Sequence, residues 1–155
     1  MTQKIFLIFI SLTTLLTVTV GQKVNLIIQV NDKLIVTGLY NFQMTFYSVN
    51  SKKQFAVNYV PGDLSIDEYL WHKINLDSNS MLFLKFDYSI FTKGDQEIAN
   101  FSVALTQHTL KRQYLILNIY DFRDKKYKHW YQWHTNKAFL AELSFPGSGI
   151  YIRKR

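Results

Sequence analysis

Apolar and polar residues alternate along most of the chain, in short runs separated by turn-forming residues. Successive side chains of a β-strand point to opposite faces, so a period of two predicts strands with one buried face. Turn signals such as Asn-Asp-Lys at 31–33 and Pro-Gly-Asp at 61–63 separate these runs. The pattern predicts an all-β fold, an antiparallel β-sandwich of about eight or nine strands with little helix.

The clearest prediction is a hairpin over residues 82–105, with a Thr-Lys-Gly-Asp turn at 92–95 between its strands. Odd-numbered residues of the first strand, such as Lys85 and Asp87, are polar and are expected to face solvent. The expected buried face consists of alternate residues of both strands: Leu82, Leu84, Phe86, Tyr88, Ile90, Ala99, Phe101, Val103 and Leu105. Residues 114–122 are apolar on both faces, which predicts a central strand.

Residues 64–76 carry two conflicting signals. Ser65 with Glu68 three residues later resembles a capping box, which predicts the start of a helix. The alternation of Leu70, His72 and Ile74 indicates an extended strand instead. We expect one helical turn followed by a strand.

The N-terminal segment differs from the rest of the chain. Residues 1–21 contain Lys4, then an apolar run from Ile5 to Val20, then Gly21, which is the pattern of a cleaved secretory signal peptide. The run is interrupted by serine and threonine and is shorter than the about 20 residues of a spanning helix. We therefore expect a signal at 1–21, a single domain at 22–155, and a secreted or lumenal protein. The alternative is an uncleaved anchor, which would make the chain a small single-pass subunit of a membrane assembly.

The chain contains no cysteine, so the domain must be held together by its core alone. Twelve Phe and ten Tyr supply large side chains for that core, and also suit an alternative function as a carrier of an apolar ligand. Without thiols, Cys-based zinc sites and cysteine nucleophiles are excluded.

Positive charge is concentrated at the C-terminal end. Of the formal net charge of +7, residues 123–155 contribute +6, from eight basic and two acidic residues, while 22–122 is neutral. Local positive charge is an argument about binding partners and not about fold.

Catalytic and metal-binding patterns are missing. No Gly-x-Ser-x-Gly and no glycine-rich phosphate loop occurs, and no pair of the four histidines (His72, His108, His129 and His134) has helical spacing. The sequence therefore favours a non-catalytic protein with no metal and no cofactor.

One loop is similar to the calcium-binding loops of C2 domains. Asp121 and Asp124 follow a predicted strand in the segment Tyr-Asp-Phe-Arg-Asp-Lys-Lys. The likeness covers only these two aspartates, and the neighbouring Arg123, Lys125 and Lys126 would repel a cation that wants six to eight oxygen ligands. A calcium site is not expected.

The stretch from Arg123 to Lys137 combines basic and aromatic residues. Read as a strand, it places Tyr127, His129, Tyr131 and Trp133 on an apolar face, and Trp130 on the other face with Lys126, Lys128, Gln132 and His134. We interpret Trp130 as a stacking platform and its four neighbours as polar contacts for a sugar ring or an anionic polysaccharide, with Arg153, Lys154 and Arg155 as an electrostatic tail. Alternatively, Trp130 packs under a loop and the lysines form a solvated face that discourages edge pairing.

Asn100-Phe101-Ser102 is the single glycosylation sequon, with Asn100 on the solvent face of its strand. Taken together, these features predict a non-catalytic binding or interaction module with a protein or glycan partner. Aromatic and basic residues also suit single-stranded nucleic acid, but an exported protein seldom meets it. A membrane contact is expected only if the N-terminal segment stays uncleaved.

Overall fold

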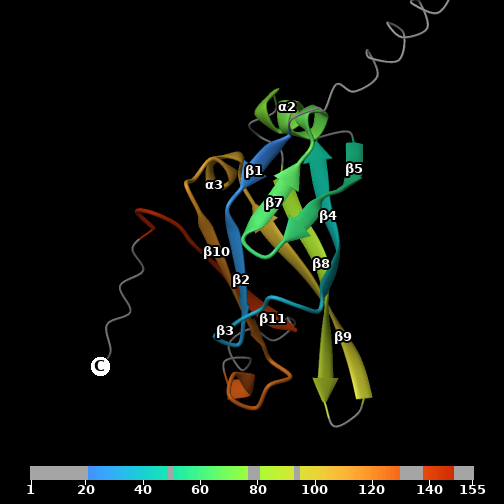
Figure 1. Cartoon of the computed structure of the whole chain (residues 1–155), viewed down its shortest axis with the longest axis vertical. Coiled ribbons are helices and arrows are strands. Elements are labelled where there is room, and N and C mark those ends of the chain that lie inside the picture. Colours follow the sequence, from blue (N-terminus) through green and yellow to red (C-terminus); the bar gives the residue numbers. More distant parts are fainter. Residues whose placement is uncertain (1–20, 49–50, 77–80, 93–94, 130–137, 149–155) are drawn as a thin grey trace, which may run out of the picture.

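Figure 1 shows the computed structural model of the chain, which describes residues 21–48, 51–76, 81–92, 95–129 and 138–148. These residues form eleven strands in three sheets and two short helices, α2 (Glu68–Leu76) and α3 (Gln107–Leu110). The fold is all-β and sandwich-like, as the alternation predicted. The three sheets share one hydrophobic core.

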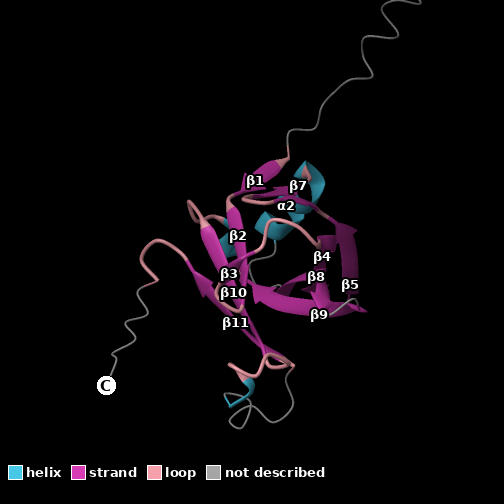
Figure 2. Cartoon of the chain, turned by 60° about the horizontal axis from the view of Figure 1, so that its bottom comes forward, coloured by secondary structure: helices cyan, strands magenta, loops and turns pink. Residues whose placement is uncertain are grey.

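The small sheet has the strand order β1 (Gln22–Val24), β7 (Asp63–Ile66), β6 (Asn58–Val60). The second sheet has the order β11 (Phe139–Ser144), β10 (Leu115–Asp121), β2 (Leu26–Val30), β3 (Lys33–Leu34). The third sheet has the order β5 (Ser51–Ala56), β4 (Leu39–Ser48), β8 (Met81–Thr92), β9 (Asp95–Leu105). Figure 2 shows the second and third sheets on opposite sides of the interior, with β9 and β11 as the nearest strands of the two.

The predicted hairpin is the β8–β9 pair. Its antiparallel register runs without a shift from Leu82 opposite Leu105 to Thr92 opposite Asp95. The alternation is confirmed in β9, where every second residue is nearly inaccessible to solvent and the residues between are exposed. The buried residues are Ala99, Phe101, Val103 and Leu105. The hairpin therefore has one face in the core and one in solvent.

The second sheet is mixed, whereas the sequence predicted antiparallel pairing throughout. β2 and β10 lie side by side and run in the same direction, with Leu26 opposite Leu115 and Val30 opposite Ile119. β10 is central in its sheet, as predicted. The strand count is also higher than predicted, partly because apolar runs are divided between sheets. Residues 22–30 form β1 and β2, and residues 51–60 form β5 and β6.

The expected helical turn and strand over 64–76 are wrong in their order and extent. Ser65 belongs to β7, and the helix α2 spans the residues expected to be extended. Asp67 caps this helix, because its Oδ1 accepts a hydrogen bond of 2.7 Å from the backbone N–H of Leu70. Leu70 and Ile74 are both buried; they are four residues apart, so they share a helix face as well as a strand face.

Truncation of Leu84, which is fully buried in the central strand β8, is expected to lower the free energy of unfolding strongly. Leu84→Ala removes buried methyl groups and leaves a cavity, so we expect a loss of about 2–5 kcal/mol. Ile98→Ala is the matched control: Ile98 is 54% exposed on β9, and its truncation should cost within about 0.5 kcal/mol. Urea unfolding of both variants tests the prediction, and equal losses would contradict it.

Candidate functional site

The first part of the basic, aromatic stretch is not a strand. Residues 122–127 form consecutive turns and residues 128–129 are in 3-10 conformation, so the alternation predicted for this part is wrong. Tyr127 is buried and His129 is exposed, although both were expected on one face. The turns form because aspartate side chains accept local backbone N–H groups: Asp121 that of Arg123 at 3.0 Å, and Asp124 that of Lys126 at 2.9 Å.

Lys126 has a partner within the chain. Its Nζ donates to Oδ2 of Asp32 at 2.8 Å, and the hydroxyl of Tyr127 donates to the same oxygen. Asp32 lies in the two-residue turn between β2 and β3, where Asn31 and Asp32 both have positive φ, as in the tight turns that asparagine and aspartate favour. The hydrogen bonds from Lys126 and then Tyr127 lower the pKa of Asp32. Lys126 therefore fixes the 122–129 turn segment to the β2–β3 turn.

The two aspartates of the C2-like loop are both engaged. Asp121 is buried, and its carboxylate accepts from Nε and Nη2 of Arg123 in a fork-like arrangement. Asp124 accepts from Nδ2 of Asn31 at 3.2 Å. Among the described residues, no group of three His, Cys, Asp or Glu side chains is placed to hold a metal ion.

Most of the predicted contact surface lies outside the described residues. This holds for Trp130, Gln132 and His134, and for the tail residues Arg153, Lys154 and Arg155. Of the basic residues that are described, Lys125 and Lys128 are exposed. The stacking role of Trp130 stays a prediction, for which a glycan-binding array with wild type and Trp130→Ala is the direct test.

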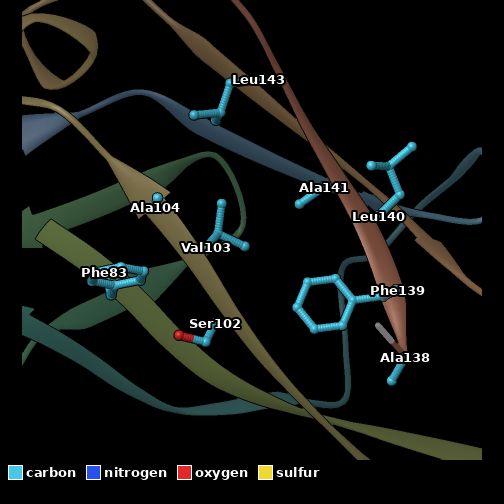
Figure 3. A pocket seen from close by; sticks show the side chains of 9 residues that line it. All are labelled: Phe83, Ser102, Val103, Ala104, Ala138, Phe139, Leu140, Ala141 and Leu143. Carbon is cyan, nitrogen blue, oxygen red and sulfur yellow. The ribbon is translucent and has the colours of Figure 1, made fainter. Parts of the chain in front are cut away.

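A groove of about 550 Å³ opens between β9 and β11 (Figure 3). It is lined by residues of the two strands and by neighbours that flank them: Phe83, Ser102, Val103, Ala104, Ala138, Phe139, Leu140, Ala141 and Leu143. The lining is mainly apolar and contains several small side chains. The groove is not evident from the sequence, because it is formed by two strands that the sequence alone does not place side by side.

The groove is formed by strand edges and not by strand faces. Ser102, Val103 and Ala104 are consecutive in β9, and residues 138–141 are consecutive at the start of β11. Because alternate side chains point to opposite faces, consecutive residues meet one hollow only along the edge of a strand. In the described sheets β9 pairs with β8 alone and β11 with β10 alone, so each presents a free edge.

An aromatic contact marks one end of the groove. The rings of Phe101 and Phe139 meet edge to face there, with centroids 5.0 Å apart. Ala104 and Leu143 line the other end (Figure 3). The two strands therefore run in the same direction along the groove.

The outer edges of the same two sheets are protected, whereas the edges at the groove are not. β5 carries the exposed lysines Lys52 and Lys53, and β3 is two residues long and contains Lys33. Short strands and lysines are the usual means of preventing edge-to-edge pairing. β9 has eleven residues in unbroken register and contains neither lysine nor proline.

A smaller polar hollow of about 370 Å³ lies on the solvent face of β4, β8 and β9. Its centre is Asp87, which accepts hydrogen bonds from Nδ2 of Asn41 at 2.7 Å and of Asn100 at 2.6 Å. Asn41 lies at a β-bulge and has a positive φ of 55°. Asn100 is exposed, as expected for a sequon asparagine, and its amide is held by Asp87.

Comparisons of the chain with models of known protein families, with curated proteins and with solved structures find no match. Within the described ranges, no helix is long and apolar enough to cross a membrane.

The hydrogen-bonded cluster of Asp32, Lys126 and Tyr127 makes the free energy of unfolding depend on pH in the acidic range. A lowered pKa means that the folded state favours the carboxylate, so this stabilisation is present above the ordinary aspartate pKa of about 4. It is lost as pH falls through the lowered pKa. We expect Asp32→Asn to be less stable than wild type at pH 7 and to lose less stability between pH 5 and pH 3.

Urea midpoints measured at intervals across this range test the prediction, with Asp95→Asn at the exposed start of β9 as a matched control. If Asp32→Asn and wild type lose stability in parallel as pH falls, the cluster does not contribute as described.

Proposed function

We propose that this protein is a secreted, non-catalytic binding module whose contact site is the groove between β9 and β11. The observation that carries the proposal is the pair of free, unprotected strand edges on either side of an apolar hollow of about 550 Å³. Ligand pockets in proteins commonly have volumes of about 300–1,000 Å³ and a mainly apolar lining. The groove thus has the size and the chemistry to hold an apolar, extended ligand.

The 122–129 turn segment, called the basic turn segment below, lies at one end of this groove. The backbone N–H of Phe122 donates to the carbonyl of Ala138, a lining residue, at 3.1 Å. Arg123 extends from the same segment to Glu97 of β9, with Nη1 and Oε2 3.7 Å apart. Lys125 and Lys128 of the same segment are exposed, and we take them as the positive charge that an anionic part of the ligand would meet at the Ala138 end.

The proposed export rests on the signal-like sequence at 1–21. β1 begins at Gln22, directly after the expected cleavage point, and pairs with β7 through residues 22–24. Removal of residues 1–21 would thus leave every described strand intact. Export also gives the sequon at Asn100 access to the glycosylation machinery.

Intact-mass spectrometry of the protein secreted by a eukaryotic host tests this part of the proposal. We expect a chain that starts at or near Gln22, because residues 1–21 are removed during export. We also expect a mass loss on treatment with an N-glycosidase that is absent from Asn100→Gln. A chain that still begins at Met1 would rule out the cleaved signal and favour the membrane-anchored alternative.

Binding of the apolar, anionic dye 1-anilinonaphthalene-8-sulfonate tests the groove itself. We expect the wild-type chain to enhance the fluorescence of the dye, because the groove offers an apolar surface beside cationic side chains. Ala141→Trp fills the groove and should weaken dye binding at least about tenfold, the equivalent of 1.4 kcal/mol.

Ala56→Trp is the matched control for this experiment, since Ala56 is an exposed alanine on β5, away from the groove. It should leave dye binding unchanged. No enhancement in wild type, or equal enhancement in all three proteins, would remove the groove as a contact site.

A further inference from the structure

We infer that the groove accepts an extended peptide of another protein, which adds as a strand to the free edge of β9. The end of the peptide that lies beside the 122–129 turn segment carries acidic residues. This inference rests on the proposed function, because it takes the groove as the contact site. It adds the class of the partner, the mode of recognition and the direction of binding.

The free edge of β9 is suited to accept a strand. Its eleven residues pair with β8 in continuous register, so no bulge interrupts the edge along its length. The side of β9 that faces the groove carries backbone N–H and C=O groups that β8 does not use. An extended peptide gains affinity by pairing with such groups and specificity by placing alternate side chains in neighbouring pockets.

The lining gives alternate side chains of the peptide a place to pack. Val103 is nearly buried beside the groove, and Ala141 and Leu143 contribute from β11. Ala104 and Ala141 are small, so the hollow between the two strands has room for branched apolar side chains such as valine. A peptide with apolar residues at every second position therefore fits the groove, because such residues all point to the same side of a strand.

We take the peptide to pair antiparallel to β9, as β8 does on the other edge of β9, because antiparallel pairing is slightly the more stable kind. β9 and β11 run the same way, from the Phe101–Phe139 contact toward Ala104 and Leu143. A strand that pairs antiparallel to β9 has its N-terminal end near Leu143 and its C-terminal end near Ala138. The C-terminal end of the peptide thus approaches the basic turn segment.

Charge selects the partner. Lys125 and Lys128 are exposed on the turn segment. Of the nearby acidic residues, Asp124 accepts a hydrogen bond from Asn31, and Glu97 of β9 is paired with Arg123. Acidic residues at the C-terminal end of the peptide would meet this positive charge. Such complementarity mainly raises specificity and the rate of association.

The same charge disfavours two other occupants. The chain turns at Phe145–Ser148 after β11, so a C-terminal tail folded back along β11 would bring Arg153, Lys154 and Arg155 toward the basic turn segment. A second copy of the chain carries the same excess of positive charge. A partner with acidic residues avoids this repulsion between like charges.

Fluorescence polarisation with two labelled peptides tests the inference. The probe Val-Thr-Val-Thr-Val-Glu-Glu alternates apolar and polar residues and ends in two acids, and the comparison peptide ends in Lys-Lys instead. We expect the full exported chain to bind the acidic probe at least about tenfold more tightly than the basic peptide. Hydrogen exchange should show new protection at residues 102–104 of β9.

Three variants make the test specific. Ala104→Lys introduces at the exposed edge of β9 the residue that protects β5, and should weaken binding of the acidic probe at least about tenfold. Ala56→Lys makes the same change on β5 and should leave binding unchanged. The double substitution Lys125→Glu with Lys128→Glu should reverse the preference, so that the Lys-Lys peptide binds more tightly.

The outcomes separate this inference from the proposed function. Dye binding that depends on Ala141, together with no binding of either peptide, would overturn strand addition and favour an apolar small molecule in the same groove. Peptide binding without protection at 102–104 would also overturn it. Tighter peptide binding after truncation behind Ser148 would assign the groove to the chain's own tail, and dimerisation abolished by Ala104→Lys would assign it to a second copy.

Discussion

Four phenylalanine rings in sequential contact join the third sheet to the second. Phe42 of β4 stacks on Phe86 of β8 at 4.9 Å, Phe86 meets Phe101 of β9 at 5.6 Å, and Phe101 meets Phe139 of β11 at 5.0 Å. Aromatic pairs at such distances contribute about 0.5–1.5 kcal/mol beyond the area that they bury. In a chain without cysteine, this series of contacts does what a disulfide between sheets does in other sandwiches: it holds β9 and β11 together at one point.

The groove begins beside the contact between Phe101 and Phe139. Beyond Phe139 the small side chains of Ala141 and Ala104 replace aromatic rings, so the two edges no longer meet and a hollow remains between them. The protein therefore keeps two kinds of edge. The outer edges carry lysines or are very short, and the inner edges are long or apolar and open toward each other. This asymmetry is why we assign binding to the inner pair.

Local patterns in the sequence predicted the elements well where one face of a strand is buried. The alternation in β9 and in residues 82–86 of β8 identified the correct inward residues, because burial of one face enforces a period of two. Farther along β8 it held less well, since Ser89 is buried while Tyr88 and Ile90 are only partly buried. It failed at 122–129, where Asp121 and Asp124 satisfy backbone N–H groups that a strand would have paired. It also failed at α2, because Leu70 and Ile74 fit both periods and the cap at Asp67 decides between them.

The groove could not be predicted from the sequence for a different reason. No local pattern states that β9 and β11 are neighbours, since they belong to different sheets and are joined by contacts between distant residues. Two features of the sequence are consistent with the groove: residues 95–105 contain no lysine, and residues 102, 104 and 141 are small. These features indicate a groove only once the two edges are known to face each other.

The parallel pairing of β2 with β10 has a consequence for the time course of folding. Leu26 pairs with Leu115, about 90 residues later in the chain. During synthesis the N-terminal end emerges first, so β2 has to wait with its apolar face uncovered until most of the polypeptide has been made. Contacts between such distant residues slow folding and prolong the exposure of unpaired strands. A chain of this topology would benefit from a chaperone while it folds.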